Sequence, residues 1–279
     1  MTFWQLDELV RTALQEDIGH ADITTASLIP KEQYAKGIFI AKDSGIIAGL
    51  EVCERVFKNL DNQVEFRSNI DDGDQVDCGS EIAVVKGPTR VLLTGERVAL
   101  NFLQRLSGIA TKTRSLVETI KYYKAELVDT RKTTPGLRYL EKYAVNVGGA
   151  RNHRFGLYDG ILIKDNHIKA VGSIQKAVST VRQRVPHTFK IEIEVENLDQ
   201  LEEAIEARAD IILLDNMDLE TLKNAVDLAQ GQAFLEASGG INECNILEVA
   251  KTGVDFISMG ALTHSVKSLD ISFKIKETY

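Results

Sequence analysis

The chain has 279 residues, of which 44% are hydrophobic and 27% charged, and its formal net charge is −8. This composition is typical of a globular protein and excludes disordered, collagen-like and coiled-coil chains. The negative charge argues against nucleic-acid binding, and because no run approaches about 18 apolar residues, no membrane span is expected. The three cysteines (Cys53, Cys78 and Cys244) contain no C-x-x-C pair, and the acidic N-terminus is unlike a signal peptide. Both features favour a reducing, cytoplasmic location.

The first third of the chain predicts a small α+β region. Residues 5–16 carry apolar side chains at helical spacing, and the turn-rich residues 17–30 are expected to form a loop. Residues 34–95 contain short apolar runs between Gly, Asp and Asn turns, which predict antiparallel strands, the last of them over residues 89–95. Residues 95–123 predict a helix in which the pair Ser107-Gly108 is a candidate break.

From residue 126 onward, apolar runs alternate with helical stretches, which indicates right-handed crossovers and a parallel sheet. Six runs are clear, and a seventh or eighth is considered near residues 144–147. The clear runs occupy residues 126–132, 159–167, 190–197, 210–216, 234–240 and 255–260. So many strands favour a closed α/β barrel over an open sheet.

The last twelve residues, 268–279, alternate apolar and polar side chains through Leu269, Ile271, Phe273 and Ile275. A barrel strand should be apolar on both faces, so this half-buried strand is expected to return to the N-terminal β region. The sequence therefore predicts an N-terminal α+β domain over residues 1–104, completed by residues 266–279. The α/β barrel is inserted between them, over residues 105–265.

Polar or glycine residues end every expected barrel strand, where the active site of an α/β barrel lies. Glu194 and Asp215 end neighbouring strands. Such carboxylates can hold Mg²⁺, bind sugar hydroxyls or stabilise a positive ribosyl carbon, and each alone can also be a helix cap or a salt bridge. The glycine-containing ends near residues 239 and 260 resemble phosphate-binding loops.

Basic residues are dense between residues 131 and 169, where eight Lys or Arg face three Asp or Glu. Several cations in one cleft imply a ligand with several negative charges, because arginine binds carboxylate and phosphate bidentately. A solvated surface position is favoured for Lys142 and Lys169. The three-residue spacing of Lys164 and His167 carries little information in a loop, where it is expected to lie.

Several long segments closely resemble the quinolinate phosphoribosyltransferase family. They are TRKTTPGLRYLEKYAV, GGARNHRFGLYDGILIKDNHI, EIEVEN, LLDNM, EASGGI and DFISMGALTHS. The segments EDIGHADITT and ERVALNFLQRLSGIAT are also similar to that family, so the resemblance covers nearly the whole chain. Ala150 stands where the family usually has a third glycine. The resemblance implies an N-terminal open sandwich and a seven-stranded TIM-like α/β barrel.

The resemblance also implies an activity: transfer of the phosphoribosyl group of 5-phosphoribosyl 1-pyrophosphate to quinolinate with decarboxylation, in NAD biosynthesis. Mg²⁺ is implied, bound through the pyrophosphate with Glu194 and Asp215 nearby. The substrate carboxylates would contact Arg131, His153 and Arg154. Lys132, Lys164 and His167 would contact either substrate, with Lys132, Glu194 and Asp215 catalytic, and the 5-phosphate would bind to Ser238, Gly239, Gly240 and Gly260. Arg105 would reach the neighbouring subunit's site, which implies a homodimer or a larger assembly such as a hexamer.

Three alternatives stay open. A branch of the same family linked to molybdenum uptake shares the architecture and takes another substrate, and a nicotinate-specific transferase is similar. A barrel that binds a phosphorylated ligand without catalysis belongs to a different class. The cations at Arg105, Arg131, His153, Arg154 and Lys164 favour a dicarboxylate, and the acids Glu194 and Asp215 argue against a simple anion binder.

Overall fold

The computed structural model describes residues 3–279, which divide into two compact units. The first comprises residues 3–114, with Thr134–Gly149 and Ser265–Tyr279. The second comprises Ser115–Thr133 and Ala150–His264. Across residues 3–279 no helix combines the length and the apolar character that crossing a bilayer requires.

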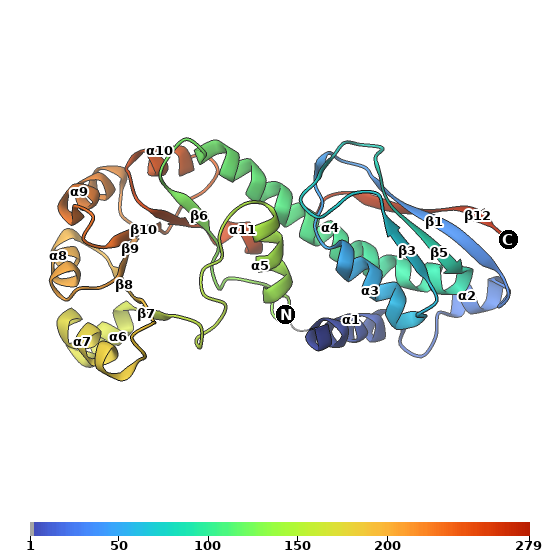
Figure 1. Cartoon of the computed structure of the whole chain (residues 1–279), viewed down its shortest axis with the longest axis horizontal. Helices are drawn as coiled ribbons and strands as arrows, with labels where there is room; N and C mark the ends of the chain where they lie inside the picture. Colours follow the sequence, from blue (N-terminus) through green and yellow to red (C-terminus); the bar gives the residue numbers. More distant parts are fainter. Residues whose placement is uncertain (1–2) are drawn as a thin grey trace. The chain divides into compact units, whose positions relative to one another are not determined.

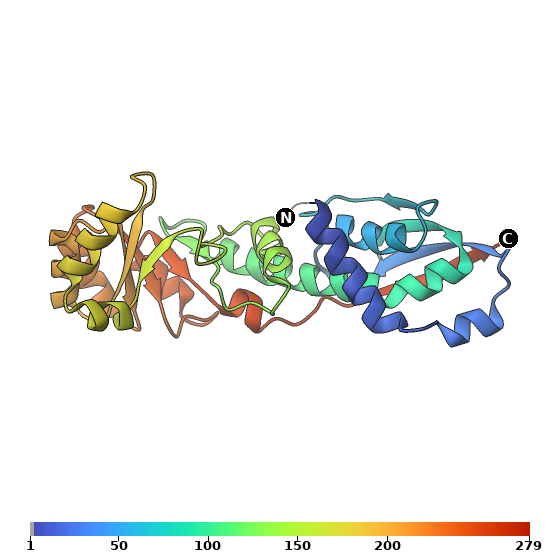
Figure 2. The same cartoon turned by 90° about the horizontal axis from the view of Figure 1, so that it is seen from below.

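The first unit is built on a four-stranded antiparallel sheet. Its order is β12 (Ile271–Thr278), β1 (Tyr34–Ala41), β5 (Glu81–Pro88) and β3 (Glu65–Ser68). The C-terminal strand therefore pairs with β1, as the alternation of apolar residues predicts, and Figure 2 shows the blue and red ribbons side by side. A short second pair joins β2 (Gly45–Ile46) to β4 (Gln75–Val76).

Aromatic side chains fill the core of this unit. The ring of Phe39 on β1 lies 4.9 Å from that of Phe273 on β12 and 6.1 Å from that of Phe57 on α3 (Leu50–Leu60). All three side chains are buried. The other helices of the unit are α1 (Phe3–Ile18), α2 (Ile23–Leu28), the first part of α4 (Thr89–Ile120) and α5 (Arg138–Val147).

Three expectations for this unit were wrong. Residues 89–95 begin α4 instead of forming a strand, because an apolar run of that length is equally compatible with a buried helix. Gly108 does not break the helix: a Cβ there would lie 2.3 Å from the carbonyl oxygen of Lys267, so the glycine allows the returning chain to approach. The expected loop contains α2, whose first turn Asp22 caps by accepting the N–H of Thr25.

Two further helices in this unit differ from expectation. Helix α3 interrupts the region expected to contain only strands. Residues 144–147, considered for an extra barrel strand, lie in α5. Lys142 on α5 is fully buried rather than solvated, because the same helix also buries Leu140 and Glu141.

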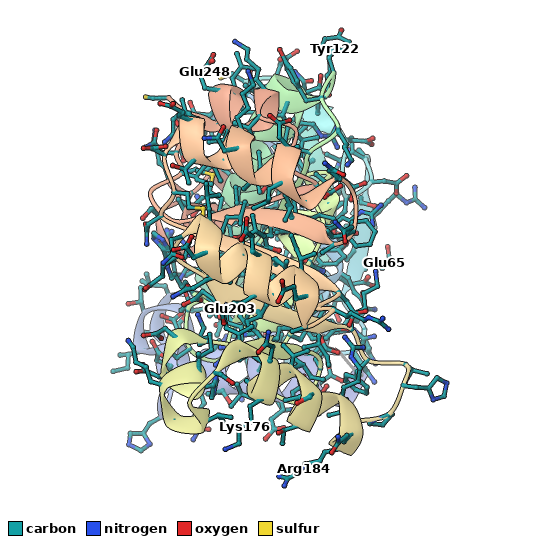
Figure 3. The ribbon with its side chains drawn as sticks, turned by 90° about the vertical axis from the view of Figure 1, so that its left-hand side faces the viewer. Glu65, Tyr122, Lys176, Arg184, Glu203 and Glu248 are labelled. Atoms are coloured by element: carbon teal, nitrogen blue, oxygen red, sulfur yellow. The ribbon has the colours of Figure 1, made fainter. Side chains whose placement is uncertain are left out.

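The second unit is a parallel sheet of six strands with helices on its outer side (Figure 1). The strands are β6 (Glu126–Val128), β7 (Ile161–Ile163), β8 (Ile191–Val195), β9 (Ile211–Asp215), β10 (Phe234–Ser238) and β11 (Phe256–Ser258). The helices are α6 (Asp165–Val171), α7 (Ile174–Arg184), α8 (Leu198–Glu206), α9 (Leu219–Ala229), α10 (Ile246–Lys251) and α11 (Ala261–His264). Figure 3 shows α7, α8 and α10 from outside, with the exposed side chains of Lys176, Glu203 and Glu248 on the surface.

The order of this sheet, β6-β11-β10-β9-β8-β7, joins the first strand in sequence to the last, as a barrel requires. A seventh position is only a single bridge between Arg151 and Val128 on the other side of β6. The seven expected strands are therefore six strands and one bridge, and within residues 3–279 no pairing joins the Arg151 segment to β7. Ala150, just before the bridge, is buried and is not among the residues with positive φ, so its methyl group fits without backbone strain.

Candidate active site

A cavity of about 630 Å³ opens within the second unit, at the carboxyl ends of its strands. It is lined by most of the candidate residues: Arg131, Lys132, His153, Arg154, Lys164, Glu194, Asp215, Ser238, Gly239 and Gly240. Their convergence follows from the topology, because the ends of parallel strands meet at one edge of a sheet. The cavity thus holds cations, acids and a glycine turn together.

Three candidate residues do not line this cavity. Gly260 lies beside it, since a Cβ there would meet the Cδ of Lys132 at 3.0 Å. His167 lies at the start of α6, where its Nδ1 accepts the backbone N–H of Lys164 at 2.9 Å. The three-residue spacing is therefore that of a helix start, which the expected loop did not predict. Arg105 belongs to the first unit, on α4.

Arg105 is held by a buried acid within that unit. Its Nη2 donates to Oε1 of Glu141 at 2.8 Å, and the side chain of Glu141 is completely buried. Glu141 also accepts the backbone N–H of Thr134 at 3.0 Å. Since a charge-assisted bond to a buried carboxylate restrains the guanidinium, Arg105 has a defined orientation.

The acids at the strand ends have different partners. The ammonium of Lys164 donates to Glu194, on the end of β8. Asp215, at the end of β9, accepts the side-chain amide of Asn216 at 2.9 Å and forms no ion pair with any residue of the described chain. Lys132 likewise has no ion-pair partner among residues 3–279. Asp215 and Lys132 therefore keep their charges available to a ligand in the cavity.

Two guanidinium groups face the same cavity. Burial and the charge of Arg131 both lower the pKa of Arg154, while Glu192 acts in the opposite direction. Arg154 donates from Nη1 to the carbonyl oxygen of Gly160 at 2.8 Å, and its buried Nε has no hydrogen-bond partner in the described chain. Adjacent like charges, together with the unpartnered Nε of Arg154, favour an anionic ligand that bridges the two groups.

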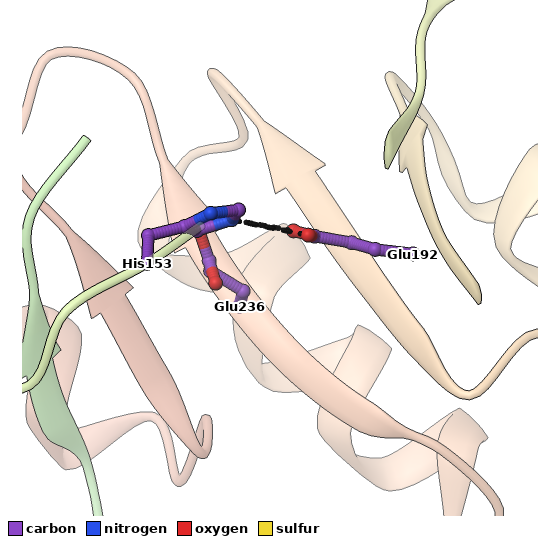
Figure 4. A group of neighbouring side chains, drawn as sticks. All are labelled: His153, Glu192 and Glu236. Carbon is purple, nitrogen blue, oxygen red and sulfur yellow. Dashed lines mark hydrogen bonds and ion pairs between the residues drawn. The ribbon is translucent and has the colours of Figure 1, made fainter. Parts of the chain in front are cut away.

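Buried carboxylates lie next to this cavity, on the inner face of the sheet. Glu192 on β8 and Glu236 on β10 are 5% and 4% exposed, and both surround the imidazole of His153. Figure 4 shows the ring of His153 pointing to Glu192, with Glu236 approaching from β10. Nε2 of His153 lies 3.0 Å from Glu192 and 3.8 Å from Glu236.

The hydrogen bonds of His153 determine where its proton lies. Nδ1 accepts the backbone N–H of Arg154 at 2.7 Å, so the hydrogen of the neutral ring is on Nε2 and faces Glu192. The backbone N–H of His153 donates to Asp129, which is fully buried, at 2.8 Å. Burial and the charge of Glu192 raise the pKa of Glu236 to about 7.

The glycine turn after β10 is shaped by close contact. Gly239 has φ of +92°, and a Cβ there would lie 2.1 Å from Oδ1 of Asn216. Asn216 itself has φ of +56° and donates its backbone N–H to Ser238 at 2.8 Å. The turn therefore brings backbone groups directly to the cavity wall, as an anion-binding turn requires.

Three buried acids of this site, Asp129, Glu192 and Glu236, are not among the residues predicted from the sequence. A signal for Glu192 was present, because the letters IEIEVE place glutamates 192, 194 and 196 on one face of the strand. The other face, Ile191, Ile193 and Val195, is completely buried. The assumption that barrel strands are apolar on both faces hid this pattern.

Comparisons with known proteins agree with the fold. The family model described as "Quinolinate phosphoribosyl transferase, C-terminal domain" matches residues 109–274, and its N-terminal counterpart matches residues 22–107. A Bacillus subtilis (strain 168) protein named probable nicotinate-nucleotide pyrophosphorylase (carboxylating) is 48% identical over 275 residues, covering 99% of this chain and 95% of that protein.

Solved structures give the same result. The nicotinate-nucleotide pyrophosphorylase of Francisella tularensis has a TM-score of 0.95 at 42% identity, covering 99% of this chain and 98% of that one. NadC of Streptococcus pyogenes has a TM-score of 0.94 at 45% identity, covering 100% and 98%. The chain belongs to the quinolinate phosphoribosyltransferase family.

Proposed function

We propose that this protein transfers the phosphoribosyl group of 5-phosphoribosyl 1-pyrophosphate to quinolinate with decarboxylation. The products are nicotinate mononucleotide, pyrophosphate and CO₂, and the reaction feeds NAD biosynthesis. One observation carries the proposal: Arg131 and Arg154 converge on the same cavity as Asp215 and the Gly239 turn. A dicarboxylate fits the guanidinium pair, and a sugar phosphate fits the acids and the turn.

Charge development explains how these residues act. As the ring nitrogen attacks the ribosyl carbon and pyrophosphate leaves, the sugar becomes positive and the leaving group carries the negative charge. Asp215 and Glu194 stabilise the positive sugar, and Lys132 stabilises the departing oxygens. Lys164, which is bonded to Glu194, orients that carboxylate. No covalent intermediate on the protein is required.

We also propose that Mg²⁺ takes part, bound through the pyrophosphate with Glu194 and Asp215 nearby. The fit rests on Asp215, a carboxylate that lines the cavity and forms no ion pair within residues 3–279. Mg²⁺ usually combines a few carboxylates with substrate phosphates and waters. Bound there, it would supply neutralising charge for the leaving group.

We further propose a homo-oligomer with a dimer at its core, hexamers included, in which Arg105 completes the partner's cavity. Support comes from the fully buried Glu141, which fixes the Arg105 guanidinium outside the unit that holds the cavity. Mixing inactive Arg105→Ala with inactive Asp215→Asn tests this. If sites are shared, one of the two sites in each mixed dimer is intact, and about half of the dimers in an equal mixture are mixed, so the mixture should recover roughly a quarter of wild-type activity. No recovery after subunit exchange, or a monomer by light scattering, contradicts the proposal.

The cytoplasm is the location that we propose, because thiols at Cys78 and Cys244 are exposed and free.

The experiment for the activity is direct. Purified protein is incubated with 5-phosphoribosyl 1-pyrophosphate, Mg²⁺ and either quinolinate or nicotinate, and mononucleotide and CO₂ are measured. Mononucleotide from quinolinate with equal CO₂, and none from nicotinate, is expected. Turnover of nicotinate indicates a nicotinate-specific transferase. Binding of both substrates without product points to a non-catalytic barrel, and no binding of quinolinate points to the molybdenum-linked branch.

A further inference from the structure

Two buried glutamates inside a barrel require an explanation. Moving a carboxylate out of water is costly unless the group is paired or protonated, and TIM-type barrels usually fill their interior with apolar side chains. Glu192 and Glu236 nevertheless lie on the inner face, with Asp129 also fully buried. A second cavity of about 550 Å³ shares His153, Arg154 and Glu236 with the first. Glu236 therefore borders both cavities.

A divalent cation is one explanation that the geometry argues against. The ligand atoms of His153, Glu192 and Glu236 all lie within 4.8 Å of one another. But Nδ1 of His153 accepts the N–H of Arg154, so Nε2 carries the hydrogen and has no lone pair for a metal. A metal-binding histidine usually donates from its other nitrogen.

The hydrogen bonds indicate a protonated acid instead. Nε2 of His153 has one hydrogen, and Glu192 is the nearer of the two carboxylates that surround it. The buried Oε1 of Glu236 then has no hydrogen-bond partner within residues 3–279. A neutral carboxyl at Glu236 avoids an uncompensated charge beside Glu192.

We propose that Glu236 is the proton donor that completes decarboxylation, an inference that rests on the function proposed above. In that step the bond between C2 of the pyridinium ring and its carboxylate carbon breaks. CO₂ leaves, and the electron pair remains on C2. The pair takes the hydrogen of the Glu236 carboxyl group, which forms the new C–H bond and leaves Glu236 as a carboxylate. Solvent reprotonates Glu236 before the next turnover.

The surroundings of Glu236 suit this role. Burial and the charge of Glu192 raise its pKa to about 7, so about half of the carboxyl groups carry the proton at pH 7 and water can return it. The charged and titratable groups that face it come from four neighbouring segments: Glu192 on β8, His153 and Arg154 after the Arg151 bridge, and Asp129 after β6, together with the hydroxyl of Ser258 on β11. Arg154 also lines the cavity, where it can hold the pyridine ring of quinolinate next to Glu236.

The test separates the two chemical steps. Pyrophosphate reports phosphoribosyl transfer and CO₂ reports decarboxylation, so their ratio is measured in the wild type and in Glu236→Gln. We expect the variant to release pyrophosphate and to form CO₂ about 10²-fold more slowly, with the carboxylated mononucleotide accumulating. In the wild type, CO₂ release should fall above about pH 7. Glu236→Asp should recover part of the CO₂ release that Glu236→Gln loses.

Glu192→Gln is the matched comparison, because it changes the other buried carboxylate. It is expected to weaken quinolinate binding through His153. Because it also removes a charge that raises the pKa of Glu236, the fall in CO₂ release should move to lower pH, and below that pH the ratio of CO₂ to pyrophosphate should stay at one. Equal release of both products by Glu236→Gln, whether at the wild-type rate or with both slowed together, overturns the inference. If the wild type itself forms no CO₂ from quinolinate, the proposed function fails, and that result is distinct from a failure of the Glu236 assignment.

Discussion

The two sheets use the same alternation of side chains in opposite ways. On β12, the buried Ile271 and Phe273 lie on the side of the aromatic core of the first unit, and Lys274 and Lys276 further along the strand are exposed. On β8, Ile191 and Ile193 are buried on the outer, helix-covered face, and Glu192 lies inside. The same period of two thus gives an interior that stabilises the fold and an interior that carries chemistry. The difference predicts that substitutions in the two interiors affect different measurements.

Removing the aromatic core should give the largest effect. Phe39 is fully buried and its ring contacts those of Phe57, Phe66 and Phe273. Phe39→Ala is expected to lower the free energy of unfolding by about 3–5 kcal/mol, because it leaves a cavity. Denaturant unfolding measures this loss, and kcat per folded molecule should stay unchanged. The half-exposed Phe234 is the control, and an equal loss for Phe234→Ala contradicts the assignment.

Removing one acid from the cavity should change kcat and leave the stability nearly unchanged, the reverse of Phe39→Ala. Asp215→Asn keeps the size of the side chain and removes the charge that would stabilise the positive sugar. It should lower kcat about 10²- to 10³-fold with little change in stability. Binding of 5-phosphoribosyl 1-pyrophosphate should change less than kcat does. If binding and turnover fall by the same factor, Asp215 has no specific role in the transition state. The exposed Asp227 on α9 provides a matched control as Asp227→Asn.

The sequence predicts the residues at the carboxyl ends of the barrel strands better than the acids buried inside the barrel. Residues such as Lys164 and Asp215 follow apolar runs directly, so the topology alone brings them together. Glu236 stands between Leu235 and Ala237 in a run that is otherwise buried, and nothing local distinguishes it from an exposed acid. Glu236 is recognised as a site residue only by its position beside His153, which lies 83 positions away in sequence. Such long-range pairing is set by the fold and is not visible in a single sequence.

The same limit explains the errors in the first unit. Helix α4 and strand β5 both begin as short apolar runs, and only tertiary contacts distinguish them. Lys142 is a basic residue yet fully buried, because its neighbours on α5 determine which face packs inward. Gly108 reads as a helix breaker, but the carbonyl of Lys267 crosses at that point. In each case a contact with a distant part of the chain overrides the local pattern.

A substitution in the dicarboxylate clamp should affect substrate binding more than stability. Arg131 lines the cavity and is close enough to Arg154 to lower its pKa. Arg131→Ala should raise the KM for quinolinate about 10- to 100-fold, the cost of one charge-assisted bond. Steady-state kinetics with the other substrate held saturating measures this. Unchanged kinetics contradict the clamp, and Arg184→Ala on the exposed end of α7 is the control.

The smallest expected effect is a gain in stability. Glu236→Met replaces a buried carboxyl with an apolar side chain of similar length, and it should raise the free energy of unfolding by about 1 kcal/mol at pH 8 while abolishing normal CO₂ release.

The pH dependence of this gain follows from the raised pKa of Glu236. The folded state holds this proton between the ordinary value of 4.5 and about 7, where the unfolded chain releases it. Stability from this group is therefore fully present at pH below that window and is lost as pH rises through it. Thermal unfolding from about pH 5 to about pH 8 should show the wild type losing stability relative to Glu236→Met. Parallel profiles for the two proteins would show that Glu236 is already ionised in the folded state, and the interior of the barrel would then stabilise a second negative charge by groups other than its own proton.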